Sequence, residues 1–282
     1  MNGTLYLVAT PIGNLGDVSQ RAIETLRAVD LIACEDTRTT RKLLTHFGIG
    51  KKLVSYHEHN ERERAAEIVA RLLAGESVAI VTDAGTPAIS DPAHAVVAAA
   101  IANNIKIVPI PGAVAFVNAL VVSGLPTEAF YFGGFLPSRA SERRKRLHEV
   151  ANISATLIFY ESPHRIGKSL RDCLETLGNR RAVVARELTK FYEEIVRDDL
   201  KQLTERFENA ETRGEIVLLI DNAATSDSKL QTSDSKSVAE RVAELEAEGQ
   251  DNRAALKQAA REFGLSRSEA YRRLQSAKDL SS

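Results

Sequence analysis

The sequence predicts an α/β protein whose first part is a parallel sheet covered by helices on both faces. Three observations support this fold class. Uninterrupted Val, Ile and Leu runs alternate with helical patterns over residues 1–115. Shorter helices and more strands over 116–222 indicate a mixed α+β domain. A Ser/Asp/Thr-rich linker at 223–237 then precedes a tail at 238–282 with helical patterns only, which predicts a small helical module.

In the N-terminal domain the expected elements follow one another in strict alternation. We expect strands at 5–9, 30–36, 51–57, 77–82 and 105–110, and helices at 19–29, 38–48, 61–75 and 93–104. Each strand is almost continuous in apolar residues, as is typical of parallel strands buried on both faces. Gly48 and Gly75 mark the ends of two of the helices.

The later elements are shorter and more varied. We expect strands at 130–136, 155–161, 181–187, 192–197 and 214–221, a basic helix at 138–147 and a helix at 163–178. Ser162 and Pro163 should begin the last of these, because Pro is favoured in the first helical turn. In the tail, 252–275 reads as a helix-turn-helix with a capping box at Ser266 and Glu269. The apolar residues expected to pack across the turn are Ala255, Ala259 and Phe263 against Leu265, Ala270 and Leu274.

Charge and cysteine content narrow the class of protein. The 37 basic and 38 acidic residues give a formal net charge of −1, so any polyanion site must be a local patch. The two cysteines, Cys34 and Cys173, form no C-x-x-C pair, which fits a reducing cytoplasm and no disulfide framework. The sequence shows no signal peptide, and no apolar run reaches the ~18 residues of a membrane span.

Small and polar residues follow five successive strands of the predicted sheet. These segments are TPIGNLGD (10–17), EDTR (35–38), HEHN (57–60), DAGTP (83–87) and PGAVA (111–115). Because ligands of parallel sheets bind beyond the carboxyl ends of the strands, we expect a site there. The sequence has neither a G-x-G-x-x-G nor a P-loop motif. His57 and His59 lack a third ligand at suitable spacing, so we predict no metal.

These segments also carry a resemblance to a known family. VATPIGNLGD, LIACEDTR, VTDAGTPAISDP, PIPGAVA, GGFLP and FYESPHR occur in this order, and the similarity spans roughly residues 4–222. Together they resemble the tetrapyrrole-methylase-like (class III) methyltransferases, and within them the branch that methylates small-subunit ribosomal RNA. The resemblance implies a two-domain fold, S-adenosylmethionine as methyl donor, no metal, and a homodimer. The implied substrate is a cytidine ribose in the decoding centre of 16S rRNA, within the small ribosomal subunit.

The resemblance and the strand ends together give the expected donor site. In this family the donor lies in the cleft between the two domains. Asp83 would face its cationic end, Gly85 would allow close backbone approach, and the alternative for Asp83 is a turn cap. The full set of expected donor-binding residues is Pro11, Gly13, Asp83, Ala84, Gly85, Thr86, Pro111, Gly112 and Ala113.

Methyl transfer to a ribose hydroxyl requires alignment, and a base would assist it. The catalytic candidates, with the base left unassigned, are Glu35, Asp36, His57, Glu161 and Arg165. Asp36 could instead cap a helix or pair with Arg38. His57 could be an ordinary strand-end histidine, and Arg165 could pair with Glu161 or with an RNA phosphate.

RNA contact requires local positive charge. The expected contacts are Arg38, Arg139, Arg143, Arg144, Lys145 and Arg146, although a basic run can also be a solvated helix face. Phe135 and Tyr160 could stack on bases or belong to the core. The tail could touch RNA, support a dimer or simply pack.

Two other functions stay open. One is a tetrapyrrole methylase, against which the basic helix and the tail count. The other is a non-enzymatic ligand-sensing domain joined to a DNA-binding helix-turn-helix.

Overall fold

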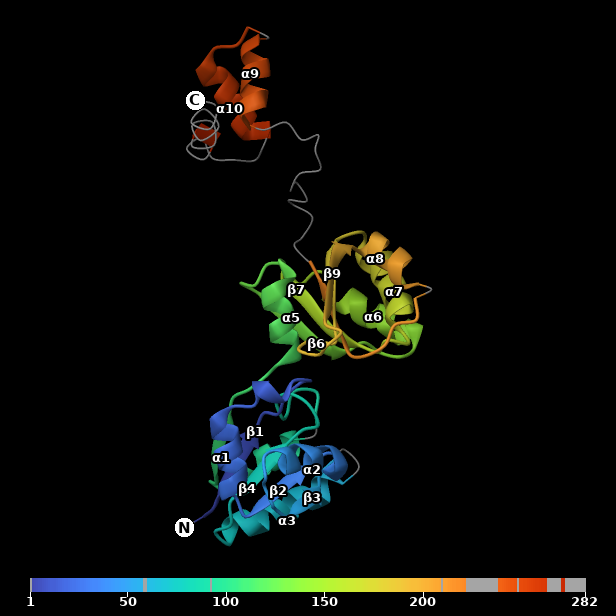
Figure 1. Cartoon of the computed structure of the whole chain (residues 1–282). Helices are drawn as coiled ribbons and strands as arrows, with labels where there is room; N and C mark the ends of the chain where they lie inside the picture. Colours follow the sequence, from blue (N-terminus) through green and yellow to red (C-terminus); the bar gives the residue numbers. More distant parts are fainter. Residues whose placement is uncertain are drawn as a thin grey trace. The chain divides into compact units, whose positions relative to one another are not determined.

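The computed structural model describes residues 2–57, 60–91, 93–208, 210–221, 238–247, 249–262 and 270–271. The chain divides into two compact units, Met1–Ala224 and Thr225–Ser282, which are drawn in Figure 1. The linker expected at 223–237 lies almost wholly in the second unit, outside the described residues. The same holds for the turn and most of the second helix of the expected helix-turn-helix. The domain boundaries expected at 115 and 222 stay a prediction.

The first sheet of unit 1 is parallel throughout, as the apolar runs predict. Its strands are β1 (Thr4–Val8), β2 (Leu31–Cys34), β3 (Leu53–Ser55), β4 (Val78–Val81) and β5 (Lys106–Ile110), in the order β3-β2-β4-β1-β5. Cys34 at the end of β2 lies opposite Val81 at the end of β4. The residues that follow these two strands therefore emerge side by side at one edge of the sheet.

Helices cover both faces of this sheet. On one face α1 (Gln20–Ala28) and α2 (Thr37–His46) bury Leu26 and Leu44 against Ile32. On the other face α3 (Glu61–Leu73) and α4 (His94–Ala102) bury Ile68 and Val96 against Leu31. Adjacent residues of β2 thus point into opposite cores, which explains why this strand is apolar at every position. A short 3₁₀ turn, η1 (Leu15–Asp17), follows β1.

The second sheet is mixed, as expected for the following segment. Its strands are β6 (Phe130–Phe135), β7 (Thr156–Glu161), β8 (Arg181–Arg186), β9 (Glu194–Asp199) and β10 (Ile216–Ile220), in the order β6-β7-β10-β8-β9. Of these described strands, only β6 and β7 pair in parallel. In Figure 1, α5 (Ala115–Ser123) lies on one face of this sheet, and α6 (Ala140–Val150), α7 (Ile166–Leu177) and α8 (Leu200–Phe207) lie on the other.

The structure corrects one expected helix start. Helix α7 begins at Ile166, and residues 163–165 form a turn in which the Arg165 N–H donates to the Ser162 carbonyl at 3.0 Å. Arg165 itself is the residue before the helix, with a non-helical φ of −121° and ψ of −10°. Pro163 therefore stiffens a turn at the end of β7 rather than the first helical turn.

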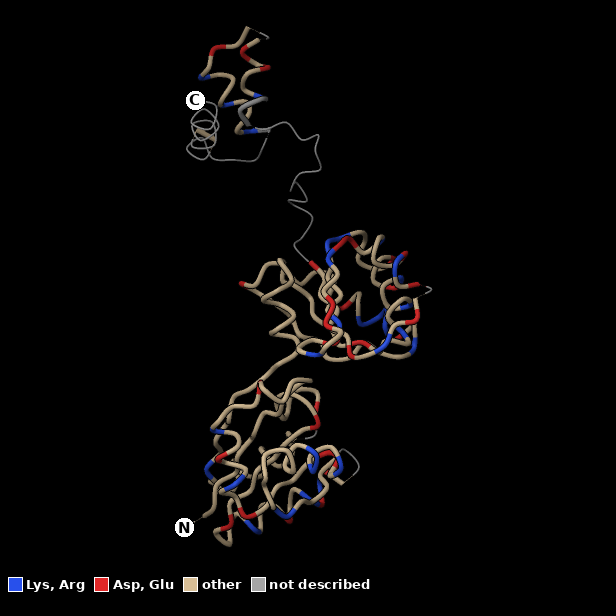
Figure 2. Tube along the Cα trace, in the orientation of Figure 1, with Lys and Arg blue, Asp and Glu red and all other residues tan. Residues whose placement is uncertain are grey.

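Unit 2 contains α9 (Val238–Ala247) and α10 (Asn252–Glu262). Their core buries Val242, Leu245, Ala255 and Ala259 together with Ala270, which confirms the expected packing of the two alanines against Ala270. Figure 2 shows acidic and basic residues interspersed along the described chain. In the part of the chain that the structure covers, every helix is too short or too polar to traverse a membrane.

Candidate active site

A cavity of about 370 Å³ opens at the carboxyl ends of the first sheet in unit 1. Both sheets supply its walls. Glu35, Asp83 and the 84–86 segment come from the loops after β2 and β4, whereas Tyr160 and Glu161 come from the end of β7. The parallel register of β2 and β4 explains why residues almost fifty positions apart meet here. This is the edge at which ligands of open parallel sheets bind.

Three carboxyl groups form one side of the cavity, and we call Glu35, Asp83 and Asp91 the acidic wall. The pKa of each is raised, first because partial burial disfavours the charged form. Repulsion from nearby carboxylates adds to the rise: Asp83 raises the pKa of both Glu35 and Asp91, and Asp36 raises the pKa of Asp83. Hydrogen bonds with the Thr82 side chain oppose this rise in the pKa of Glu35 and Asp91. A cation in the cavity would relieve the repulsion, so the wall suits a positively charged ligand.

Asp83 also holds two loops together. Its Oδ1 accepts a hydrogen bond from the Asp36 backbone N–H at 3.1 Å, and so it links the loops after β2 and β4. Asp83 therefore makes a structural contact between loops and also lines the cavity, and its contact with the donor stays a prediction.

Glycines bring backbone close to the cavity at two points. Gly85 has φ +89° and is bridged to Thr10 by two backbone hydrogen bonds of 2.8 and 3.1 Å. At Gly112 a Cβ atom would lie only 2.7 Å from the Cβ of Ala9, so a side chain cannot be placed there without movement. The segments that follow β1, β4 and β5 are thus packed together by backbone contact.

The nine expected donor-binding residues divide into two groups. Asp83, Ala84, Gly85 and Thr86 line the cavity. The others are Pro11, Gly13, Pro111, Gly112 and Ala113, which lie in the adjoining loops and not in its lining, where Ile12, Val114 and Ala115 appear instead. The Thr86 hydroxyl donates to the Ala113 carbonyl at 3.4 Å, so the second group supports the first.

The catalytic candidates are also divided. Glu35 and Glu161 line the cavity, whereas Asp36, His57 and Arg165 do not. Asp36 caps α2 through the Arg38 N–H, and its ion pair with Arg38 at 2.7 Å lowers the pKa of Asp36 to about 2. The His57 N–H donates to the Asn60 side chain at 2.8 Å. His59, the other histidine of this segment, lies outside the described residues.

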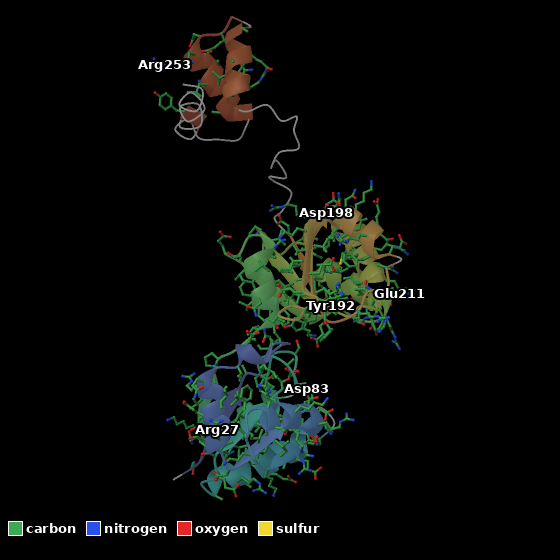
Figure 3. The ribbon with its side chains drawn as sticks, in the orientation of Figure 1. Arg27, Asp83, Tyr192, Asp198, Glu211 and Arg253 are labelled. Atoms are coloured by element: carbon green, nitrogen blue, oxygen red, sulfur yellow. The ribbon has the colours of Figure 1, made fainter. Side chains whose placement is uncertain are left out.

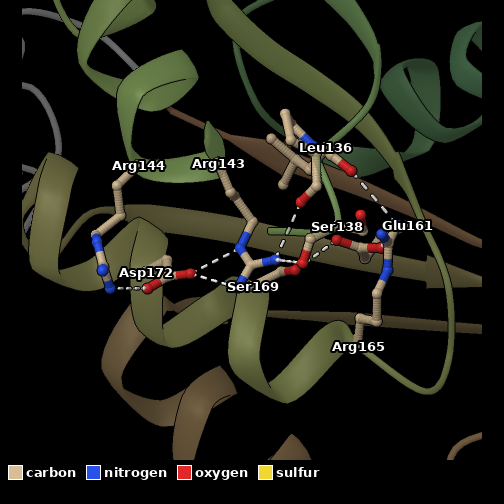
Figure 4. A network of polar contacts seen from close by, with 9 residues as sticks. Leu136, Ser138, Arg143, Arg144, Glu161, Arg165, Ser169 and Asp172 are labelled. Atoms are coloured by element: carbon tan, nitrogen blue, oxygen red, sulfur yellow. Dashed lines mark hydrogen bonds and ion pairs between the residues drawn. The ribbon is translucent and has the colours of Figure 1, made fainter. Parts of the chain in front are cut away.

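Glu161 is the centre of a buried network (Figure 4). Its Oε1 accepts from the Ser162 N–H at 2.7 Å and from Arg165 at 2.6 Å, and its Oε2 accepts from the Ser169 hydroxyl. The carboxylate is fully buried, and three donors occupy its two oxygens. It therefore positions the turn after β7, and it is a poor candidate for the base.

The position of Arg143, which lies beside this network, corrects one expected RNA contact. Arg143 is only 3% exposed, and its guanidinium pairs with Asp172 at 2.5 Å while donating to the carbonyls of Pro137 and Ser138. Arg143 lies on the inward face of α6 with Leu147 and Val150, so it is not available to a phosphate. Arg143 was expected at the surface because its neighbours in the sequence are basic. Its helical spacing to Leu147 and Val150, four and seven residues later, is the signal that it faces inward.

The other basic residues of α6 differ in their partners. Arg139 and Lys145 are exposed, with Arg139 3.4 Å from Glu142. Arg144 pairs with Asp172 at 3.0 Å, and Arg146 pairs with Glu149 at 3.2 Å and contacts the Tyr131 hydroxyl. Arg38 is exposed but paired with Asp36. Of the expected set, Arg38, Arg139 and Lys145 are therefore the most exposed, and the first two are each in an ion pair.

Sequence reasoning did not select Asp91 or Thr82. Both belong to the stretch VAIVTDAGTPAISDP, and the Asp-Pro pair that ends that stretch was the available signal. Phe135 and Tyr160 line the cavity with ring centroids 5.4 Å apart. Within the described ranges no group of three or more His, Cys, Asp or Glu residues is arranged to hold a metal ion.

Solved structures of low sequence identity share this fold. The cobalamin biosynthetic enzyme cobalt precorrin-4 methyltransferase matches with a TM-score of 0.60 and 18% identity over 78% of this chain and 95% of that one. Diphthine synthase matches with a TM-score of 0.62 and 17% identity over 77% and 90% of the two chains. Residues 4–204 match the family of tetrapyrrole (corrin/porphyrin) methylases. The chain is thus a methyltransferase of this class.

Curated relatives are more similar still. Ribosomal RNA small subunit methyltransferase I of Halalkalibacterium halodurans is 48% identical over 95% of this chain and 93% of its own length. The protein of the same name from Synechocystis is 45% identical over 95% and 96% of the two chains. The protein from Vibrio cholerae is 51% identical over 77% and 76%. The chain belongs to the ribosomal RNA small subunit methyltransferase I family.

Proposed function

We propose that this protein transfers a methyl group from S-adenosylmethionine to the 2′-hydroxyl of a cytidine in the decoding centre of 16S rRNA, in the small ribosomal subunit. The carrying observation is the cavity in which the acidic wall faces the glycine-rich strand ends. The names of the curated relatives support an rRNA substrate and favour it over a tetrapyrrole. The donor supplies an electrophilic methyl group when bound.

The residues present fit a cationic donor of this kind. The acidic wall provides carboxylates for a positively charged group, and the close backbone approach at Gly85 and Gly112 makes the adjoining loop compact. Ile12, Val114 and Leu188 add apolar surface for the uncharged part. We propose that no metal takes part, because orientation and charge can be supplied by these side chains.

The chain must also align the ribose hydroxyl and accept its proton. Alignment of the reacting groups can supply ~7–11 kcal/mol of barrier reduction, and a general base typically adds ~10²–10⁴-fold. Burial raises the pKa of Glu35 and of Asp91. A raised pKa makes either carboxylate a stronger base, and therefore a better proton acceptor. With Glu161 occupied by three donors, we propose Glu35 or Asp91 as the base.

The test is methyl transfer from labelled donor to small subunits purified from a strain that lacks the protein. We expect 2′-O-methylcytidine in digested 16S rRNA, formed equally with a chelator present. Subunits from the parent strain, already methylated, are the matched control. Failure to label the unmodified subunits, or label in a tetrapyrrole precursor instead, would contradict the proposal.

We further propose that the protein works in the cytoplasm as a homodimer. Helix α5 offers an apolar surface for this contact, because Val117 and Val121 are exposed one helical turn apart. Phe130, at the start of β6, is also exposed. Sedimentation of the purified chain should give twice the 30.8 kDa chain mass. A monomer at all concentrations would contradict this part of the proposal.

A further inference from the structure

The loop between β8 and β9 carries the two most exposed aromatic rings among the described residues. Phe191 is 92% exposed and Tyr192 is 69% exposed. Their ring centroids are 4.9 Å apart in an edge-to-face arrangement. The described part of the chain leaves both rings in solvent, although aromatic side chains of this size usually contribute to a core or to an interface. We call Phe191 and Tyr192 the aromatic tip.

The loop that presents the aromatic tip is held in a defined conformation. Glu187 and Thr189 adopt left-handed φ values of +52° and +66°. The Lys190 ammonium donates to Glu187 at 2.7 Å and to Glu215 at 3.0 Å. The Thr189 N–H donates to Glu193 at 2.7 Å. The chain therefore fixes the base of the loop by hydrogen bonds while both rings stay exposed.

This loop lies at the rim of the cavity. Leu188 and Glu215 line the cavity directly. The aliphatic part of Lys190 crosses Gly13, where a Cβ atom would be only 2.4 Å from the Lys190 Cγ. The loop is thus packed against the segment after β1, whose Ile12 also lines the cavity. Figure 3 shows Tyr192 and Asp83 on the edges of the two sheet domains that face each other within unit 1.

The charges of the loop argue against a phosphate contact. Lys190 is its single cation, and it is already paired with two glutamates. Glu193 and Glu194 follow directly after the rings. A phosphate would be repelled there. The uncharged face of a nucleobase can stack on an exposed ring, and this holds for each of the four bases.

We propose that the aromatic tip stacks on an unpaired nucleobase beside the target nucleotide and so holds that nucleotide over the cavity. This inference rests on the proposed function, since it requires RNA as the substrate. It gives the RNA-binding surface two chemically different parts. The exposed cations of α6 would bind phosphates, and the aromatic tip would bind a base.

The first test replaces both rings, with Phe191→Ala and Tyr192→Ala combined. We expect the KM for unmethylated small subunits to rise about fivefold to 150-fold, with unchanged donor affinity and an unchanged salt dependence of KM. The pair Phe191→Tyr and Tyr192→Phe should restore the parent KM, whereas Phe191→Leu with Tyr192→Leu should not. Ile101→Ala, at a residue 64% exposed on α4, is the matched control.

The second test uses fluorescence, because the chain contains no tryptophan. Phe191→Trp places a single reporter in the aromatic tip, and Ile101→Trp is the control. Addition of a single-stranded oligoribonucleotide with the sequence around the target should quench the first reporter and leave the second unchanged. Equal quenching of both reporters, or of neither, would contradict a stacking contact at the aromatic tip.

The outcomes separate this inference from the proposed function. A parent protein that does not methylate subunits refutes the function itself. A parent that methylates, with a double alanine variant of equal KM, overturns only the stacking proposal. If the emission of the Phe191→Trp variant shifts to the blue with protein concentration, before RNA is added, the aromatic tip belongs to a contact with a second copy of the chain, which would also overturn it.

Discussion

Asp83 combines a structural bond and a ligand-facing charge, and two substitutions can separate them. Asp83→Asn keeps an oxygen that can accept from the Asp36 N–H but removes the charge. Asp83→Ala removes both. We expect both variants to weaken donor binding by about 1.5–3 kcal/mol, the range for a hydrogen bond to a charged group. Only Asp83→Ala should also lower Tm. Calorimetric titration and thermal unfolding measure the two effects, and unchanged donor affinity in both variants would leave Asp83 with the loop contact alone.

The acidic wall should make stability depend on pH in an unusual direction for carboxyl groups. The pKa values of Glu35, Asp83 and Asp91 are raised in the folded chain. The folded chain therefore binds more protons than the unfolded chain above the ordinary carboxyl pKa of about 4. The contribution of these groups to the free energy of unfolding is present below that pH and is lost as pH rises through the raised pKa values.

Asp91→Asn tests this dependence, because the amide resembles the protonated acid. We expect the Tm of the variant to exceed that of the parent near pH ~8, and the difference to close near pH ~4, the ordinary range of carboxyl groups. Scanning calorimetry across this range gives the comparison. A Tm difference that does not vary with pH would contradict the raised pKa of Asp91.

At the scale of elements, α6 separates a structural arginine from surface arginines. Arg143→Gln leaves Asp172 buried with one partner fewer, so we expect a loss of about 3–5 kcal/mol in the free energy of unfolding. Arg144→Gln, next to it but half-exposed, should cost less than about 1 kcal/mol. Denaturant unfolding of the two variants provides the measurement. Equal losses would show that the burial of Arg143 does not determine its energetic role.

The exposed cations of the same helix should control the salt dependence of substrate binding. In Arg139→Gln combined with Lys145→Gln, each lost phosphate contact should reduce the slope of log affinity against log salt by roughly 0.7–0.9. Donor affinity should stay at the parent value. Methyl transfer to small subunits over a salt series tests this, and parallel slopes for variant and parent would exclude Arg139 and Lys145 from the RNA site.

The sequence predicted the strands well and two helices not at all. All ten strands of the described residues overlap the predicted runs, because each run has the length of a buried strand and ends in turn residues. Helix α5 was missed because AFVNALVVS is apolar on almost every side and lacks a polar stripe. Helix α8 does have a signal, since Asp199 caps it at the Gln202 N–H and Leu200, Leu203 and Phe207 are buried at helical spacing.

The candidate site was predictable only in part for a related reason. The strand ends identify the edge of the sheet, and therefore Glu35 and the 83–86 segment. The strand ends do not reveal which side chains will be occupied by hydrogen bonds and ion pairs within the protein. Glu161 and Arg143 became structural because donors and acceptors from distant elements reach them, which no local pattern contains.

At the scale of the whole molecule, every described residue that lines the cavity belongs to unit 1. A chain ending at residue 224 should therefore bind the donor with the affinity of the full chain and unfold with a similar Tm. Any change in KM for small subunits would then measure the contribution of unit 2 to RNA binding. Calorimetry and kinetics on the two chains make the comparison, and weaker donor binding by the shorter chain would contradict the assignment of the site to unit 1.

The acidic wall also bears on turnover. Under the proposed chemistry the sulfur of the donor is positive before transfer and neutral afterwards. Carboxylates that attract the fresh donor therefore attract the spent one less, and the same three side chains favour exchange in the forward direction. We therefore expect the loss of one charge at the reacting atom to weaken product inhibition, without a conformational change of the protein.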